Sequence, residues 1–323
     1  MKGTGMRKQI IWGIGFMLCT AAFCTACGKS QKTSIQDPYT IGVVTKSSTS
    51  EYWMSLCEGV KEAADQYNMN VIILQPDSET NKEAQIKMME TLAKKKVDMI
   101  AVSPVDSHSA SEYLEAAQEH DIPVISYDDG FDNREIPYIG IDNEKAGYEL
   151  MKYLAEQMNH QGQVGIICGH LSQRCHRLRL EGAKRYLANE PDMTLAYVES
   201  GYSNLQLKEE VIDRLRQEHP NVKGVMVTSA ATAMGVVEAV ADEDIRIVSV
   251  DAQTDALDAL KEGRITALTA QSGYQTGYET VCYISELKNG KTEEKQKLLD
   301  AQLLTQENVE AYMKEKNQKE QQK

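Results

Sequence analysis

From residue 39 to residue 305, short apolar segments alternate with segments whose apolar residues recur at helical spacing. The apolar segments are rich in Val and Ile and lack a clean apolar–polar alternation, as in YTIGVVTK (39–46) and VIILQPD (71–77). Strands that are buried on both faces of a parallel sheet have this pattern. The segment between them, EYWMSLCEGVKEAADQYN (51–68), has the spacing of an amphipathic helix. The sequence therefore predicts an α/β fold with parallel sheets.

The number of strand–helix units predicts more than one lobe. About ten units follow one another, which is too many for one domain of ordinary size. Right-handed crossovers between parallel strands produce an open, doubly wound sheet. We therefore expect two doubly wound parallel-sheet lobes.

The N-terminal residues form a separate segment. Lys2, Arg7 and Lys8 precede an apolar run, 10–27, that is too short and too interrupted by Cys and Thr to predict a spanning helix. A positive head, an apolar middle and small residues before a boundary are typical of an export signal. We expect residues 1–26 to be removed and the mature chain to work outside the cytoplasm.

The end of this signal resembles the lipobox of bacterial lipoproteins. Thr25 and Ala26 precede Cys27, whose thiol would carry the lipid, and 27–37 would form a polar tether. The position three residues before the cysteine is usually aliphatic but is Cys24 here, so an ordinary signal peptide cleaved nearby is the alternative. The resemblance implies a chain held by lipid at the outer face of the cell membrane.

Charge and cysteine content exclude two classes of protein. The formal net charge is −13, and loss of the three positive charges of the signal would bring it to −16. An acidic chain without a basic cluster is not expected to bind nucleic acid. Too few cysteines remain beyond the signal for a disulfide scaffold, so we expect buried free thiols. These cysteines are Cys57, Cys168, Cys175 and Cys282.

Polar residues follow most of the predicted strands. In doubly wound sheets, ligands bind beyond the carboxyl ends of the strands. In PVISYDDG (123–130), two adjacent carboxylates, Asp128 and Asp129, follow an apolar strand. Their mutual repulsion requires water or a partner that compensates it, so this strand end is a candidate binding position.

One cluster raises the question of a metal site. Cys168, His170, Cys175 and His176 lie within nine residues. The spacing is not a paired Cys-x-x-Cys, and the adjacent residues Cys175 and His176 cannot easily both reach one tetrahedral ion. We expect no structural zinc here, and neither another metal nor a cofactor.

Six segments in order resemble the ribose-binding type of periplasmic sugar-binding protein, over roughly residues 38–310. They are SEYWMSLCEGVKEAA (50–64), PVISYDDG (123–130), RLRLEGA (177–183), IVSVDAQTDAL (247–257), ALTAQSGYQTGY (267–278) and LLDAQLLTQENV (298–309). In that family the first segment supplies two aromatics that stack on the sugar. The next four supply an acid, a first arginine, an aspartate and a glutamine that contact the ligand. The resemblance implies the type I periplasmic binding protein fold, with three hinge crossovers between the lobes.

Sugar chemistry agrees with these residue types. Carboxylates, guanidinium groups and amides match the hydroxyls at the edge of a sugar ring, and aromatic side chains match its apolar faces. Ser50, in the loop before the helix, is either an N-cap or a ligand contact. The expected ligand-binding residues are Ser50, Tyr52, Trp53, Asp128, Asp129, Arg177, Tyr202, Ser229, Asp251 and Gln271.

Plain structural roles are the alternatives. Tyr52 and Trp53 could simply pack at a helix start. Arg177 could pair with Glu181, four residues on. Asp251 could cap the helix that follows it.

Two positions depart from the family pattern. The family often has Asn-Asp at the strand end before TAMG, where this chain has Ser229 and Ala230. The residue after the first acid is frequently Arg but is Asp129 here. Losing an amide and exchanging a cation for an anion should change which hydroxyl pattern fits. The charge balance raises the hypothesis of an amino sugar or another ligand that carries positive charge.

The expected domains follow from three crossings, near IGIDN, ALTAQ and LLDAQ. One lobe would contain 38–140 and 270–296, and the other 141–269 and 297–315, with 316–323 as a polar tail.

We therefore expect a monomeric solute-binding lipoprotein that closes its lobes over a monosaccharide or related polyol and delivers it to an ABC transporter. Presentation of a sugar-like signal to a membrane sensor kinase is the alternative. A carbohydrate-processing enzyme that uses Asp128 and Asp251 as paired carboxylates is the remote alternative.

Overall fold

The computed structural model describes residues 38–133, 135–202, 209–241, 244–291 and 294–321. The expected export signal, Cys27 and the tether lie outside these residues. The described residues form one compact unit. Within the described residues, no helix is both long and apolar enough to cross a membrane.

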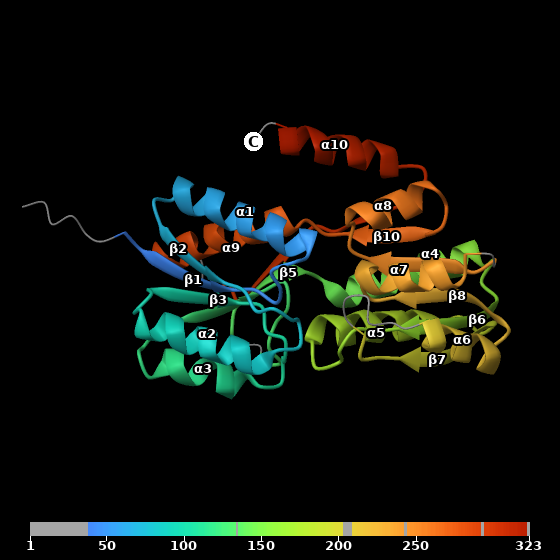
Figure 1. The fold of residues 1–323 in the computed structure, drawn as a ribbon, viewed down its shortest axis with the longest axis horizontal. Coiled ribbons are helices and arrows are strands. Elements are labelled where there is room, and N and C mark those ends of the chain that lie inside the picture. The colour runs from blue at the N-terminus through green and yellow to red at the C-terminus, as the bar shows by residue number, and fades with distance from the viewer. Residues whose placement is uncertain (1–37, 134, 203–208, 242–243, 292–293, 322–323) are drawn as a thin grey trace, which may run out of the picture. The chain divides into compact units, whose positions relative to one another are not determined.

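The strands form two sheets of six (Figure 1). The first sheet has the order β11-β5-β4-β3-β1-β2 and is parallel throughout. The second has the order β12-β10-β9-β8-β6-β7, and only β12 is antiparallel. The first sheet consists of β1 (Thr40–Val44), β2 (Asn70–Leu74), β3 (Met99–Val102), β4 (Val124–Tyr127), β5 (Tyr138–Ile141) and β11 (Gln296–Leu299). The second consists of β6 (Gly162–Ile167), β7 (Met193–Glu199), β8 (Val222–Val227), β9 (Arg246–Val250), β10 (Ala267–Ala270) and β12 (Gln302–Leu304).

Helices cover both faces of each sheet, which confirms the predicted α/β fold with two parallel-sheet lobes (Figure 1). The first lobe has α1 (Glu51–Gln66), α2 (Lys82–Lys94), α3 (Ala110–Gln118) and α9 (Gly273–Lys288). The second has α4 (Asn143–Gln157), α5 (Arg174–Leu187), α6 (Glu209–Glu218), α7 (Ala230–Ala239), α8 (Thr254–Lys261) and α10 (Val309–Gln321).

Burial on both faces explains why the strands lack alternation. In β1, Ile41 and Val43 pack into the core under α1 and α9, whereas Val44 packs into the core under α2 and α3. Both sets are fully buried. Since each face needs apolar side chains, consecutive positions are apolar.

The chain passes between the sheets after β5, after β10 and after β11. Two of these strands, β5 and β10, end one residue later than the expected lobe boundaries, at Ile141 and Ala270. The expected boundary after residue 296 falls inside β11, which pairs with β5 as far as Leu299. The third crossing therefore lies at Asp300 and Ala301. At the C-terminus, α10 continues as helix to Gln321, where we expected a polar tail from residue 316.

Close packing of α4 on α5 fixes the position of α5, which contributes side chains to the cavity described below. A Cβ at Gly182 would lie 1.9 Å from the carbonyl oxygen of Glu144. A Cβ at Gly147 would lie equally close, 1.9 Å, to the carbonyl oxygen of Arg179. The two helices can approach this closely because neither glycine carries a side chain.

Candidate ligand-binding site

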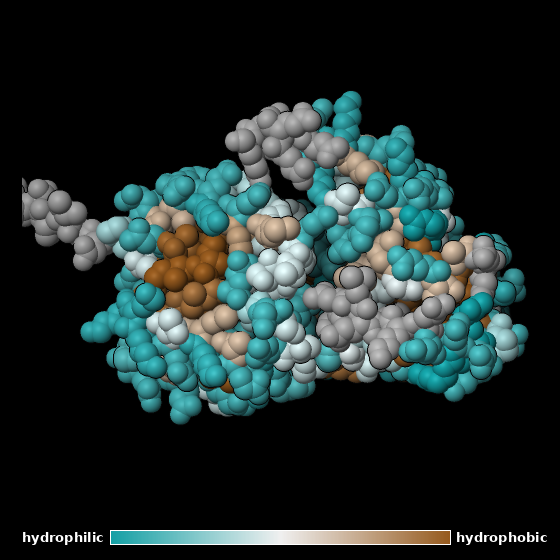
Figure 2. All heavy atoms as spheres, viewed as in Figure 1, coloured by the Kyte–Doolittle hydropathy of each residue, from teal (hydrophilic) through white to brown (hydrophobic). Residues whose placement is uncertain are grey.

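A cavity of about 1510 Å³ lies between the two lobes. The surface is hollowed at this place (Figure 2). Its wall is built from the carboxyl ends of β4, β9 and β10 and from the first turns of α1, α5, α8 and α9. This is the location that the topology of doubly wound sheets favours for a ligand.

Seven of the ten expected ligand-binding residues line this cavity. They are Ser50, Tyr52, Trp53, Asp128, Ser229, Asp251 and Gln271. Ser50 occupies the N-cap position of α1, but its side chain makes no capping hydrogen bond.

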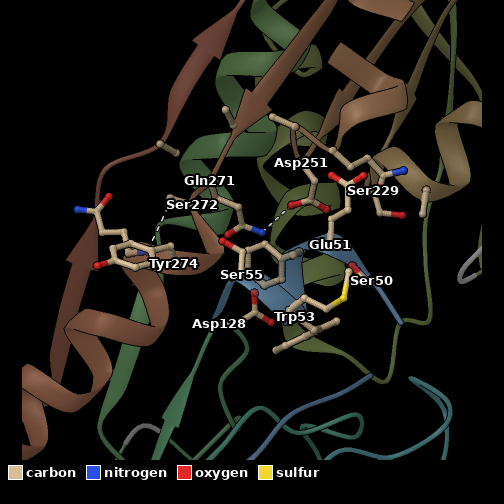
Figure 3. Close-up of a pocket in the computed structure, with 18 of the residues that line it drawn as sticks. Ser50, Glu51, Trp53, Ser55, Asp128, Ser229, Asp251, Gln271, Ser272 and Tyr274 are labelled. Atoms are coloured by element: carbon tan, nitrogen blue, oxygen red, sulfur yellow. Dashed lines mark hydrogen bonds between the residues drawn. The ribbon is translucent and has the colours of Figure 1, made fainter. Parts of the chain in front are cut away.

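Asp128 and Asp251 point into the cavity from two sides (Figure 3). They follow β4 and β9, which hold equivalent places in the two sheet orders. Both have left-handed backbone angles, with φ of 59° and 82°. Ser103 Oγ donates to Asp128 Oδ2 at 3.1 Å, and Gln271 Nε2 donates to Asp251 Oδ1 at 2.7 Å. Each carboxylate is thus held in place and keeps an oxygen that can accept a bond from a ligand.

Asp251 does not cap α8. The N-cap position of α8 is Gln253. The backbone N–H of Thr254, the first residue of α8, donates to Glu51 Oε2 at 3.1 Å. Glu51 belongs to α1 in the other lobe, so this hydrogen bond joins the two lobes.

Tyr52 and Trp53 combine packing with exposure to the cavity. Their rings meet edge to face at 5.2 Å, and both contact the core of the first lobe. Trp53 Nε1 donates to Glu79 Oε1 at 3.0 Å. Tyr52 and Trp53 therefore do pack at the start of α1, as the alternative to a binding role supposed, but both side chains also line the cavity.

Asp129 is not among the lining residues, so its expected role as a neighbour that tunes the ligand is not supported by its position. It is 1% exposed. Its Oδ2 accepts from Lys46 Nζ at 3.0 Å, and its Oδ1 accepts from the Cys175 N–H at 2.9 Å. Because Cys175 lies in the first turn of α5, Asp129 caps a helix of the opposite lobe.

Lys46 compensates the two adjacent carboxylates. Its Nζ lies 3.0 Å from Asp129 Oδ2 and 3.7 Å from Asp128 Oδ2, and it donates to Gln173 Oε1 of the second lobe at 2.8 Å. Burial would lower the pKa of Lys46, but the negative charges of Asp129 and Asp128 outweigh burial and raise this pKa. Burial also raises the pKa of Asp128, and Lys46 offsets only part of that rise.

Arg177, the arginine expected to contact the ligand, lies outside the lining set. Its guanidinium donates to Asp132 Oδ1 at 2.5 Å and to the Leu171 carbonyl. Arg179 lines the cavity instead, where Nε donates to Asn143 Oδ1 at 2.8 Å and Nη1 to the Thr228 carbonyl at 2.7 Å. Two residues along an α-helix point to nearly opposite sides, so only one of the two arginines can face the cavity.

Tyr202 is also absent from the lining residues that the structure describes. Its hydroxyl donates to Glu199 Oε2 at 3.3 Å, and its ring packs against the core of the second lobe.

Five charged or polar side chains line the cavity but were not among the expected ligand-binding residues: Lys46, Glu79, Gln173, His176 and Arg179. These residues other than Arg179 follow the ends of β1, β2 and β6, so the strand-end rule indicates all of them.

The cysteine–histidine cluster does not form a metal site in the described part of the chain. Cys57, Cys168, Cys175 and Cys282 are free and buried, as we expected. Burial raises the pKa of Cys168 and of Cys175 to about 12. Both are therefore unreactive thiols at neutral pH.

His176 should make stability depend on pH. It is buried, with Nδ1 2.7 Å from Thr228 Oγ1, and burial, with the charges of Arg179 and Lys46, holds its pKa well below the usual range. A depressed histidine pKa contributes stability above the unfolded-state pKa of about 6.5, and acid removes it. Relative to His176→Gln, the wild type should lose about 1 kcal/mol of unfolding free energy between pH 6.5 and pH 5.5 in urea titrations, because the unfolded histidine is already half protonated at pH 6.5. His120→Gln, at an exposed position, is the control, and an equal pH slope in both variants would contradict the prediction.

Fold and cavity define a two-lobed binding protein, and comparison with known proteins identifies the family. The sequence model of the periplasmic binding protein domain family matches residues 41–292. The chain therefore belongs to this family, in its type I form. The ribose import binding protein RbsB of Bacillus subtilis is 24% identical over 272 residues, which cover 83% of this chain and 87% of that protein. The D-ribose/D-allose-binding protein of Pseudomonas aeruginosa is 25% identical over 300 residues, covering 87% and 93%.

Solved structures show the same fold. A periplasmic solute-binding protein of Actinobacillus succinogenes with bound D-allose superposes with a TM-score of 0.78 at 24% identity, covering 85% of this chain and all of that one (100%). A sugar-binding protein of a Bacillus halodurans sugar ABC transporter gives a TM-score of 0.73 at 27% identity, covering 85% and 99%. Members of this family bind solutes outside the cytoplasm and are not enzymes.

Proposed function

We propose that this chain is a lipid-anchored solute-binding protein that captures a monosaccharide or related polyol in the cavity and delivers it to an ABC transporter. One observation carries the proposal: carboxylates, an amide and a guanidinium from both lobes converge on one cavity beside aromatic side chains. Asp128, Asp251, Gln271 and Arg179 would bond the hydroxyls at the ring edge, and Tyr52 would lie against a ring face. The sugar-binding relatives support this ligand class.

Contacts across the cavity support capture by closure. Glu51 accepts from α8, and Asp129 accepts from α5, so the first lobe caps two helices of the second. These bonds can form only when the lobes are together. Closure around the three crossings would surround the ligand with groups from both lobes and exclude water.

Cys27 is the proposed lipid attachment site, at the start of the tether 27–37. Anchoring would keep the binding protein near a transporter in the same membrane. Labelling with a fatty acid analogue should mark the wild-type chain and leave Cys27→Ser unlabelled.

Isothermal titration calorimetry tests the proposed ligand class. The chain from Gly28 onward would be titrated with pentoses, hexoses, polyols and amino sugars. One saturable ligand is the expected result. No heat of binding across the whole panel would overturn the sugar assignment.

The two arginines of α5 provide a matched test of the site. Arg179 is 3% exposed and lines the cavity, whereas Arg177 and its partner Asp132 are 20% and 42% exposed outside it. Arg179→Met should weaken binding of the identified sugar by about tenfold or more, since charge-assisted hydrogen bonds would be lost. Arg177→Met should change affinity by no more than about fivefold, because partly exposed pairs contribute at most about 1 kcal/mol. The reverse order of effects in calorimetry would mean that the ligand lies elsewhere.

A further inference from the structure

Carboxylates outnumber cations around the cavity. Among the described residues, eight lining side chains are acidic and three are Lys or Arg. The acidic ones are Glu51, Glu58, Glu62, Glu79, Asp128, Asp251, Asp300 and Glu315. The cationic ones are Lys46, Arg179 and Lys316.

The cations are engaged with groups other than the inner carboxylates Glu79 and Asp251. Lys46 pairs with Asp129 at 3.0 Å, which lies behind the cavity wall, and Lys316 lies 3.8 Å from Glu51. Arg179 directs Nε and Nη1 to neutral oxygens of its own lobe. Within the described part of the chain, Glu79 and Asp251 form no ion pair.

Glu79 stands beside an aromatic ring. Its Oε1 accepts from the indole N–H of Trp53, which leaves Oε2 for a ligand. The Trp53 ring is in turn fixed edge to face against Tyr52. A carboxylate oxygen that no protein group occupies is favourable for an ammonium group, which gains a charge-assisted hydrogen bond.

Burial of this acidic wall is costly without a ligand. Burial raises the pKa of Glu79, and the charge of Lys46 and the hydrogen bond from Trp53 offset this only in part. Asp128 shows the same balance. A ligand with a positive charge would supply the missing compensation, whereas a neutral sugar would leave these charges uncompensated.

We propose that the ligand is a sugar or polyol that carries a positively charged group, and that Glu79 determines this specificity by receiving that group. The inference rests on the proposed function, because it assigns a charge to the ligand of the same cavity. Asp128 and Asp251 would then bond hydroxyls of the ligand, while Glu79 bonds its ammonium group. The acidic residue Asp129, whose charge is neutralised by Lys46, takes no part in this specificity.

The test compares matched sugars by calorimetry at neutral pH and low salt. D-glucosamine, D-galactosamine and D-mannosamine would be titrated beside the parent hexoses and the N-acetyl derivatives, which lack the charge. At least one amino sugar should bind about tenfold or more tightly than both of its neutral counterparts. Glu79→Gln should remove that preference, because the glutamine oxygen can still accept from Trp53 while the charge is lost.

Glu112→Gln is the control for net charge, because Glu112 lies outside the cavity and is 51% exposed beside Lys82. It should leave the preference unchanged, and an equal loss in this variant would overturn the role of Glu79. Tighter or equal binding of the neutral sugars would overturn the charge inference and leave the proposed function standing. Absence of binding by every sugar, charged or neutral, would overturn both.

Discussion

Lys46→Met should lower the free energy of unfolding by about 3–5 kcal/mol, the range found when one partner of a buried ion pair is removed. Lys46 is 3% exposed and Asp129 is 1% exposed, so the carboxylate could not recover its lost partner from water. Methionine would fill most of the volume, so the loss reports the charge and its hydrogen bonds. Urea denaturation at neutral pH measures the effect.

A matched control and a double variant isolate the buried pair. Lys94 pairs with Glu90 on the surface, where the two side chains are 74% and 46% exposed, so Lys94→Met should cost less than about 1 kcal/mol. Lys46→Met combined with Asp129→Asn should be more stable than Lys46→Met alone, because the uncompensated charge is gone. A loss below about 1 kcal/mol for Lys46→Met would show that Asp129 does not depend on Lys46 for compensation of its buried charge in solution.

Asp128→Asn should have a large effect on affinity and weaken binding of the identified ligand by about 100-fold or more. The substitution exchanges a charged acceptor for a neutral amide whose NH₂ group meets the ligand's own donors. Asparagine tolerates the left-handed backbone at this position, where φ is 59°. The loss would therefore report the carboxylate and not a strained backbone.

The free energy of unfolding should change much less than the affinity in Asp128→Asn. Burial raises the pKa of Asp128, so its ionised form costs free energy in the folded state at neutral pH. A carboxyl group with a raised pKa contributes stability below its unfolded-state pKa and loses it as the pH rises. Asp128→Asn should thus cost no more than about 1 kcal/mol at neutral pH in thermal or urea unfolding.

Asp142→Asn is the control for the binding measurement. Asp142 caps α4 by accepting from the Lys145 N–H at 2.9 Å and lies outside the cavity. Asparagine is an equally good cap, so both affinity and stability should stay near the wild-type values. If Asp128→Asn binds the ligand with wild-type affinity, the Asp128 carboxylate does not contact the ligand.

Local patterns determined the fold class and the strand ends that form the cavity. Doubly buried strands require apolar residues on both faces, and β1 shows that requirement in its sequence. The carboxyl ends of parallel strands share one edge of a sheet, so Asp128, Asp251 and Gln271 could be selected before their positions were known. These inferences need only the order of the elements and not their detailed packing.

The tertiary structure decided which charged groups face the ligand. Arg177 and Arg179 are equivalent by type, and the packing of α5 against α4 turns only Arg179 toward the cavity. Asp128 and Asp129 are neighbours, yet one lines the cavity while the other caps a helix of the opposite lobe. Their separate roles depend on Lys46, which is 83 residues away from Asp129 in the sequence. Local sequence specifies the elements because their backbone preferences are local, whereas the partners of a buried charge come from distant segments that only folding brings together.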